Sequence, residues 1–285
     1  MPEGDTIFRA ARTLNRALEG QTVTRFETVL PQLSRVDQDS PIAGRTIQSV
    51  EAQGKWMLMR FSNDLTLLTH MRMNGSWHIY RPGEAWRRGR HHMRIAIETA
   101  SFVAVGFDVP VAEFHDGASL AQHPSLTRLG PDVLADDFDR DGAALRLREL
   151  AEFAVGDALL RQSMMAGIGN VFKSEICFVC GIHPFCRVAD LRAEQVSELV
   201  ATALRLVGAN VLEDSTDGVV TYRGRQRRTT NDSDPGANHW VYGRAGEPCR
   251  RCSAPIRRRI QGHDARVTFW CAFCQPLPGE TDIYE

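Results

Sequence analysis

The sequence lacks the features that mark membrane-spanning, secreted and disulfide-rich proteins. No apolar run reaches the roughly 18 residues that a membrane-spanning helix needs. The N-terminus, MPEGDTIFR, is rich in acidic residues and has no apolar signal core. Seven cysteines in 285 residues are too sparse for a disulfide scaffold, and in a reducing compartment they are expected as thiols or metal ligands. We therefore expect a cytoplasmic protein with no membrane partner.

Biased composition is also absent. Hydrophobic residues make up 43% of the chain and charged residues 24%, which excludes a disordered, collagen-like or coiled-coil protein. A chain of 285 residues can bury an ordinary core. Its length suggests about two domains.

The formal net charge of −1 hides an uneven distribution. Residues 219–275 contain eleven arginines and four acidic residues, whereas residues 1–218 contain 23 basic and 28 acidic residues. A basic region on an acidic body indicates a polyanion-binding site near one end of the chain. A solvated arginine-rich loop would give the same counts, so charge alone leaves both interpretations open.

The spacing of apolar residues predicts one helix and then a set of strands. Between residues 3 and 18, apolar side chains recur every three or four residues, as in an amphipathic helix, and Gly20 follows as a stop signal. Four later stretches are instead rich in β-branched and aromatic residues and are separated by turn-forming residues: 21–30, 46–62, 65–80 and 92–107. Consecutive strands without intervening helices favour an antiparallel sandwich or barrel.

After residues 129–132, Leu-Gly-Pro-Asp, the pattern becomes helical. Apolar residues have helical spacing over 142–165 and 190–213. Between these stretches, a glycine turn at 167–169 leads into a short helix that ends near Gly181. We therefore place a domain boundary close to residues 130–140, and we interpret the polar, arginine-rich residues 223–239 as a connection.

Four cysteines near the C-terminus have the spacing of a metal site. Cys249 and Cys252 form one Cys-x2-Cys pair, and Cys271 and Cys274 form a second pair 18 residues later. Four thiolates on two tight turns can surround one Zn²⁺, and the segment between the pairs alternates like a β-hairpin. We expect a single structural zinc ion, because four protein ligands leave no position open for chemistry.

A third Cys-x2-Cys pair lies on the apolar helix that follows the glycine turn. Cys177 and Cys180 share one helix face, and only His183 and Cys186 lie nearby in the sequence. The absence of a second pair favours buried thiols that act as small apolar residues. A redox motif or a second metal site remains the alternative.

Motifs along nearly the whole chain resemble one enzyme family. They occur at 1–14 (MPEGDTIFRAARTL), 54–59 (GKWMLM), 70–75 (HMRMNG), 129–134 (LGPDVL), 162–178 (QSMMAGIGNVFKSEICF) and 241–275. In this order they resemble the formamidopyrimidine-DNA glycosylase and endonuclease VIII family. The resemblance implies an α+β fold with an N-terminal helix and antiparallel β-sandwich, a helix-two-turns-helix domain and a zinc-ribbon hairpin. We divide the chain accordingly into residues 1–132, 133–222 and 223–285, with the zinc finger at 240–275.

The resemblance also implies a mechanism for the N-terminus. Family members excise oxidised bases and then cut the strand, with the N-terminal proline as the nucleophile. Pro2 would attack sugar C1′ once Met1 is removed, because an α-amino nitrogen is partly neutral near pH 7. Glu3 would donate a proton to the ring oxygen as the sugar opens.

Four more positions carry expected roles, Lys55 among the catalytic residues and Asn170, Arg266 and Met73 in DNA binding. The resemblance implies that Lys55 contacts the phosphate beside the lesion and that Asn170 binds the backbone at a helix start, where N–H groups suit an anion. Arg266 would hold phosphates flanking the flipped base, and Met73 would fill the space that the base leaves. Each residue also has a structural alternative. Pro2 and Glu3 could simply start a helix, and Asn170 could cap one. Lys55 could be a solvated charge on a strand, Arg266 one of many arginines, and Met73 a core residue.

The chain departs from the family pattern at two places. An acid is usual at the sixth position, but here the pair is Asp5 and Thr6. The branch that removes 8-oxoguanine carries an Arg-Arg-Phe run on a loop after the last strands, and the corresponding residues 106–114 contain no arginine. This favours the endonuclease VIII branch and oxidised pyrimidines as substrates, unless Arg72 or Arg88 reaches in from a neighbouring loop.

The sequence therefore predicts a monomeric DNA glycosylase with abasic-site lyase activity. It would act on double-stranded DNA that carries oxidised bases or abasic sites, with single-stranded DNA left open, and would associate with the nucleoid through DNA. A catalytically inactive DNA-damage-binding protein of the same fold is the main alternative. A metal-sensing or redox protein built on Cys177 and Cys180 would leave the N-terminal motif unexplained.

Overall fold

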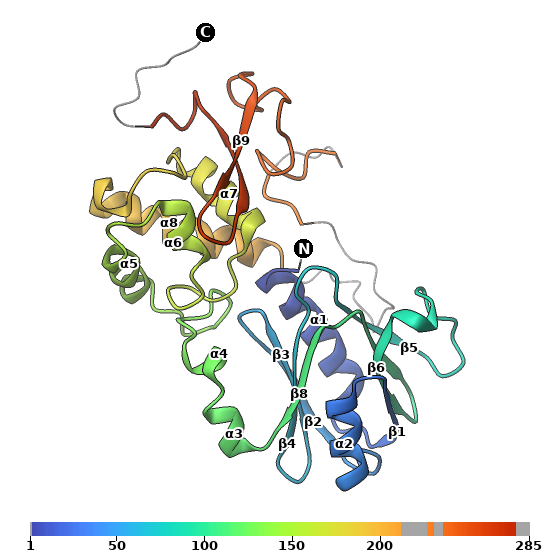
Figure 1. Ribbon diagram of the computed structural model, residues 1–285. Coiled ribbons are helices and arrows are strands. Elements are labelled where there is room, and N and C mark those ends of the chain that lie inside the picture. The colour runs from blue at the N-terminus through green and yellow to red at the C-terminus, as the bar shows by residue number, and fades with distance from the viewer. Residues whose placement is uncertain (1, 212–226, 231–235, 278–285) are drawn as a thin grey trace. The chain divides into compact units, whose positions relative to one another are not determined.

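The computed structural model describes residues 2–211, 227–230 and 236–277. The chain forms two compact units, the first built on Met1–Arg128 and the second beginning at Leu129 (Figure 1). The boundary expected at residue 132 stays a prediction. The expected boundary at 222 lies outside the described residues and stays a prediction. Within the described residues, no helix combines the length and apolarity needed to cross a bilayer.

Unit 1 contains two four-stranded antiparallel sheets. The first has the strand order β1-β6-β7-β5 and the second β2-β3-β4-β8. The strands are β1 (Val23–Thr28), β2 (Ile47–Gln53), β3 (Trp56–Phe61), β4 (Leu65–His70), β5 (Ser76–Tyr80), β6 (Met93–Thr99), β7 (Val103–Phe107) and β8 (Val111–His115). One apolar core takes side chains from both sheets, which confirms the expected sandwich.

Helix α1 (Gly4–Leu18) completes that core. Its buried face includes Ile7, Leu14 and Leu18 at the helical spacing expected from the sequence. The chain leaves the helix through Gly20, whose φ of +75° is a conformation that glycine adopts without strain. The N-terminal residues are therefore attached to a helix whose buried face is part of this core.

The sequence patterns miss several short elements of unit 1. These are α2 (Pro31–Asp39), α3 (Gly117–Ala121), α4 (Pro124–Thr127), the strand β8 and a 3₁₀ turn at Arg90–His92. The helix α2 buries only Leu33, so it lacks the repeated apolar face that would reveal it.

The described part of unit 2 contains four main helices and a β-hairpin. The elements are α5 (Arg140–Glu149), α6 (Val155–Leu160), α7 (Asn170–Val179), a 3₁₀ turn (Val188–Asp190), α8 (Ala193–Ala209), β9 (Ile256–Gln261) and β10 (Arg266–Cys271). The stretch 142–165 is interrupted, because Phe153 and Val155 exchange backbone hydrogen bonds with residues 186–188. Helix α7 ends before Gly181 as expected.

Candidate active site and nucleic-acid interface

The Pro2-Glu3 pair lies directly before α1. Glu3 is the N-cap residue with extended backbone, and its carbonyl accepts hydrogen bonds from the N–H groups of Thr6 (2.9 Å) and Ile7 (3.1 Å). The Glu3 side chain is fully buried and makes no capping hydrogen bond. The helix start therefore explains the backbone of Glu3 but gives its carboxyl group no capping role.

Asp5 is committed to the structure of α1. Its fully buried carboxylate lies 3.5 Å from the guanidinium of Arg9 and accepts a hydrogen bond from the Thr6 hydroxyl at 3.3 Å. This pairing gives Asp5 a local partner one turn along the helix. The family usually has an acid at the sixth position. Here the acid is Asp5, and its carboxylate is paired with Arg9 within α1.

Lys55 stands in the tight turn between β2 and β3. Gly54 supports this turn with a φ of +60°, and Trp56 packs edge-on against His70, with ring centroids 4.9 Å apart. Burial, with the nearby charges of Arg72 and Lys55, lowers the pKa of His70 to about 4. His70 is therefore neutral at neutral pH, and the positive charge at this end of the sheet comes from Lys55 and Arg72.

The turn between β4 and β5 exposes Met73. The N–H of Gly75 donates to the carbonyl of Met71 at 2.8 Å, and Arg72 has a φ of +49°. A Cβ on Gly75 would lie 2.6 Å from the Met71 carbonyl oxygen, so this tight turn requires glycine. Met71 is 2% exposed and Met73 is 57% exposed. The turn therefore anchors one methionine in the core and presents the other to solvent.

Residues 106–114 do not form the loop that the family resemblance suggests. They contain the end of β7, a three-residue turn and most of β8. Within the turn, Val109 is buried, and Asp108 has a φ of +48°. Partial burial tends to raise the pKa of Asp108. The hydrogen bond from His92 and the charge of Arg88 outweigh this effect and lower the pKa. Arg88 lies 2.7 Å from Asp108, so it is held at this turn.

The glycine turn before α7 is held by one side chain. Gly167 has a φ of +104°, and Gln162 accepts from its N–H while donating to the carbonyls of Leu160 and Ile168. Asn170 is the first residue of α7 and is 7% exposed. Its amide Nδ2 donates to the carbonyl of Val267 in β10 at 2.9 Å. Its Oδ1 has no hydrogen-bond partner among the described residues.

Two further buried polar residues of α7 contact the C-terminal hairpin, and a third, Glu175, holds the segment that precedes it. Lys173 donates from Nζ to the Thr268 hydroxyl at 2.6 Å, and Ser174 accepts from the N–H of Phe269 at 3.4 Å. Glu175 accepts from three consecutive N–H groups, those of Trp240 (2.8 Å), Val241 (2.9 Å) and Tyr242 (2.8 Å), and from the Thr229 hydroxyl. The sequence analysis missed these roles, although charged residues on a helix with an apolar environment are a signal of buried pairing.

Arg266 begins β10 and is half-buried. No hydrogen bond or ion pair joins its side chain to another residue within the described ranges. At the hairpin turn, a Cβ on Gly262 would lie 2.3 Å from the Asp157 carboxylate of α6, so the close approach of this turn to α6 requires glycine. The turn is thus fixed, and the guanidinium of Arg266 beside it has donors that no described residue uses.

Several other arginines of the basic region have structural partners. Arg251 donates to the carbonyl of Phe178 at 3.2 Å, Arg250 to that of His239 at 3.1 Å, and Arg244 to that of Trp240 at 2.6 Å. Arg223 and Arg225 lie outside the described residues. These three arginines keep their charge but use hydrogen-bond donors within the protein, so the arginine count overstates how many guanidinium groups are free to bind a polyanion directly.

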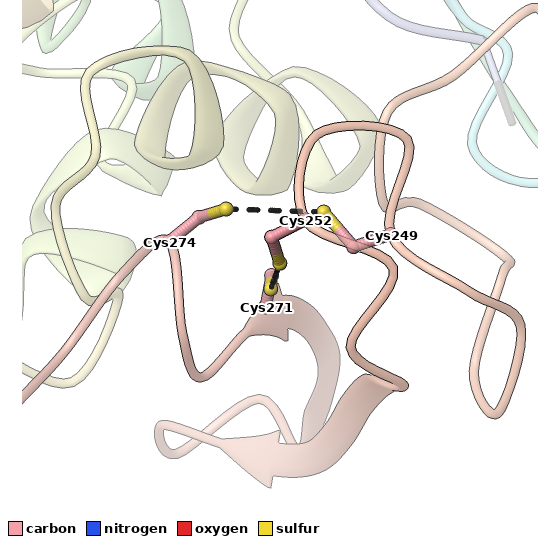
Figure 2. Close-up of side chains that lie close together, drawn as sticks. All are labelled: Cys249, Cys252, Cys271 and Cys274. Atoms are coloured by element: carbon pink, nitrogen blue, oxygen red, sulfur yellow. Dashed lines mark hydrogen bonds between the residues drawn. The ribbon is translucent and has the colours of Figure 1, made fainter.

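The four C-terminal cysteines lie together, as Figure 2 shows. The Sγ atoms of Cys249 and Cys274 are 3.9 Å apart, those of Cys252 and Cys271 are 3.4 Å apart, and all four lie within 4.8 Å of one another. A tetrahedral ion with metal–sulfur bonds of about 2.3 Å requires sulfurs about 3.8 Å apart. The four thiols form no disulfide, and their arrangement fits one metal ion.

The remaining Cys-x2-Cys pair has a different environment. Cys177 is fully buried in the core of unit 2. Burial raises the pKa of the Cys177 thiol, and it raises that of Cys180 to about 11. Protonated thiols are poor nucleophiles and poor metal ligands, so the structure favours the apolar interpretation of this pair over a redox motif.

Comparison with known proteins identifies the family. The model of the formamidopyrimidine-DNA glycosylase N-terminal domain matches residues 1–116, and the H2TH domain model of the same family matches residues 129–220. "Probable endonuclease 8 2" of Streptomyces coelicolor is 39% identical, and the alignment covers 98% of this chain and 97% of that protein. The chain belongs to the formamidopyrimidine-DNA glycosylase and endonuclease VIII family. The resemblance in the sequence motifs is thereby confirmed.

Two further relatives support this assignment. The "DNA-(apurinic or apyrimidinic site) lyase Nei2" of Mycolicibacterium smegmatis is 37% identical, covering 96% of this chain and 99% of its own length. A solved structure, the complex between the Lactococcus lactis Fpg and abasic-site DNA, has a TM-score of 0.77 at 22% identity and covers 96% of this chain and 99% of the other. This structural similarity confirms the expected fold.

Proposed function

We propose that this protein is a DNA glycosylase and abasic-site lyase that removes oxidised pyrimidines. One observation carries the proposal. In a chain of this family, Pro2 is followed by Glu3, whose buried carboxyl group does not cap the helix. In this proposal, unit 1 performs the chemistry, and the hairpin and α7 of unit 2 hold the DNA.

Pro2 supplies the nucleophile once its nitrogen is the free N-terminus. The α-amino nitrogen has a pKa of about 7.7–8.0 in the unperturbed state, so part of it is neutral near pH 7. The lone pair of the nitrogen forms a bond to sugar C1′. The bond between C1′ and the base breaks, and the base leaves with the electrons of this broken bond and takes up a proton. Met1 lies outside the described residues, and its removal is part of the proposal.

Glu3 supplies the proton that opens the sugar. Donation to O4′ breaks the C1′–O4′ bond and leaves an iminium ion between C1′ and the Pro2 nitrogen. Loss of a C2′ proton then expels the 3′ phosphate, and hydrolysis of the imine frees the enzyme.

Lys55, Asn170 and Arg266 are the proposed contacts to the DNA backbone. Lys55 stands on a turn beside other positive charge, and Arg266 has donors not used by described residues. Asn170 differs, because its amide already donates to Val267. We propose that Asn170 acts mainly by fixing β10 to α7 while the neighbouring N–H groups at the helix start face phosphate.

The four cysteines would hold one structural Zn²⁺. The donor set and the spacing of the sulfur atoms fit this ion. Bound zinc would join the turn at Cys249 and Cys252 to the end of β10 at Cys271, and so fix the strand that begins at Arg266. It would take no part in the reaction, since its four positions are filled by the protein.

The preference for pyrimidines rests on the turn between β7 and β8. A cytosine opposite a damaged purine is recognised by donors to its acceptor atoms, and a carboxylate presents none. This turn offers Asp108, and Arg88 is paired with that carboxylate. Met73, 57% exposed on its own turn, is proposed to enter the space that the flipped base leaves.

Excision assays on matched duplexes test both parts of the proposal. We expect thymine glycol and 5-hydroxyuracil to be removed faster than 8-oxoguanine opposite cytosine. Faster removal of 8-oxoguanine would refute the substrate class while leaving the glycosylase assignment intact. Glu3→Gln should abolish excision yet retain some cutting at a preformed abasic site, which has no base to remove. Binding to lesions without excision or cutting by the wild type would identify a damage-binding protein instead.

A further inference from the structure

A cluster of metal-ligating side chains lies in unit 1, apart from the cysteine site. Glu113 and His115 alternate along β8, so both side chains project from one face of this edge strand. His123 lies eight residues further on, at the N-cap of α4. Nε2 of His115 is 3.0 Å and Nε2 of His123 is 3.4 Å from the same carboxylate oxygen, Oε2 of Glu113.

These distances match the geometry of a tetrahedral ion. One ligand atom from each residue lies within 4.8 Å of the other two. Zinc binds imidazole nitrogen and carboxylate oxygen at about 2.0–2.2 Å, so neighbouring ligand atoms around it are about 3.4 Å apart. The three side chains therefore need only small shifts to surround one ion.

The donor set also selects a class of metal. Two imidazoles and one carboxylate are the protein ligands of open zinc sites, which keep a fourth position for water. Imidazole favours zinc, nickel and copper over magnesium and calcium, which prefer oxygen ligands. Because Glu113 is 44% exposed whereas His115 and His123 are 17% and 11% exposed, an ion would enter past the carboxylate.

Packing holds the two imidazoles in position. Their rings meet edge-on with centroids 5.3 Å apart, and Trp56 packs on His123 at the same separation. The outer nitrogen of His123, Nδ1, is buried and has no hydrogen-bond partner among the described residues. Metal-binding histidines in permanent sites usually donate this proton to an acceptor, which raises metal affinity about 10–100-fold. Nδ1 of His123 has no such acceptor among the described residues, which points to an exchangeable ion.

We propose that Glu113, His115 and His123 form a second, exchangeable binding site for a divalent transition metal of the zinc class. The ion joins the edge strand β8 to the α3–α4 segment at the C-terminal end of unit 1. The site is independent of the proposed DNA chemistry, because none of its ligands has a role in that reaction.

Metal analysis of the full-length chain tests this proposal. The protein, with the metal of the cysteine cluster retained, is dialysed against micromolar zinc chloride, and bound zinc is counted. Wild type should hold one equivalent more than His115→Ala/His123→Ala, and His263→Ala, which removes an exposed histidine of the hairpin turn, should match wild type. Equal zinc content in wild type and the double variant would refute the site and leave a hydrogen-bonded cluster only.

A conservative variant keeps the test independent of folding. Glu113→Gln preserves the size of the side chain but removes the charged ligand, so zinc should bind at least about 10-fold more weakly than in wild type. Zinc should also raise the melting temperature of wild type more than that of Glu113→Gln. An identical rise in the two proteins, with equal affinity, would contradict the proposal.

Discussion

The two units secure their proposed functional residues in different ways. In unit 1, a large apolar core shared by two sheets and α1 supports short turns, and these turns carry Lys55 and Met73. In unit 2, the apolar cluster beneath the hairpin is small, consisting of Phe178, Val241, Cys249, Ile256, Phe269 and Cys271. The hairpin is attached by buried hydrogen bonds from α7 and by the cysteine cluster.

This difference determines which substitutions should be damaging. Apolar side chains under the turns of unit 1 are expected to control stability, while the exposed side chains control function. In unit 2, polar side chains are expected to control both, because a buried donor or acceptor that loses its partner carries a full desolvation cost. The following predictions contrast the two units, beginning with the largest effect.

Cys271→Ser should have the largest effect, and it should be confined to unit 2. A structural zinc site contributes roughly 10–16 kcal/mol of binding free energy, so loss of one thiolate should empty the site and release the hairpin. Metal content measured by mass spectrometry should fall by one equivalent, and DNA affinity should fall with it. Full metal content in this variant would mean that the cysteine cluster is not the binding site.

Two methionines on one turn separate stability from function in unit 1. Met71→Ala should lower the free energy of unfolding by about 2–5 kcal/mol, because it leaves a cavity in the core. Met73→Ala should change it by less than about 0.5 kcal/mol while slowing base excision. Urea unfolding and excision kinetics measure the two quantities. Unchanged excision by Met73→Ala would remove this residue from the DNA interface.

Glu175→Gln should destabilise unit 2 through a single buried carboxylate. The amide group turns an N–H donor towards backbone donors, so we expect a loss of about 1–3 kcal/mol in the free energy of unfolding. Glu149→Gln, on the exposed side of α5, is the matched control and should change it by less than about 0.5 kcal/mol. Equal values for the two variants would show that the buried hydrogen bonds of Glu175 do not stabilise unit 2.

Arg266→Ala should have the smallest effect and leave the fold intact. Loss of one phosphate contact should weaken DNA binding at every sequence and reduce the slope of log K against log salt by about 0.9. Arg148→Ala removes an equal charge from the exposed surface of α5 and should leave the slope nearer to that of wild type. Binding titrations at several salt concentrations compare the two, and identical slopes would leave Arg266 with no contact to phosphate.

The sequence predicts features that depend on local spacing. The helix at 3–18, the strands and the two cysteine pairs are each encoded within a few consecutive residues, and the structure contains them. The Pro2-Glu3 assignment depended on motif resemblance, because a proline followed by an acid is also an ordinary helix start.

Contacts between distant residues could not be predicted in this way. Lys173 and Thr268 are 95 positions apart, and Glu175 meets Val241 across 66 positions. No local pattern encodes such pairs. The same limit explains why residues 106–114 suggested a loop, since β8 is recognised only by its pairing with β4.

The most direct test of the account is borohydride trapping on abasic-site DNA. Borohydride reduces the imine between enzyme and sugar to a stable amine, and mass spectrometry of the digested adduct locates the attachment. We predict a covalent complex attached at Pro2 in protein from which Met1 has been removed, and no complex at Lys55, the more exposed of the chain's two lysines. An adduct at Lys55, or none from processed protein that binds the DNA, would contradict the proposed mechanism.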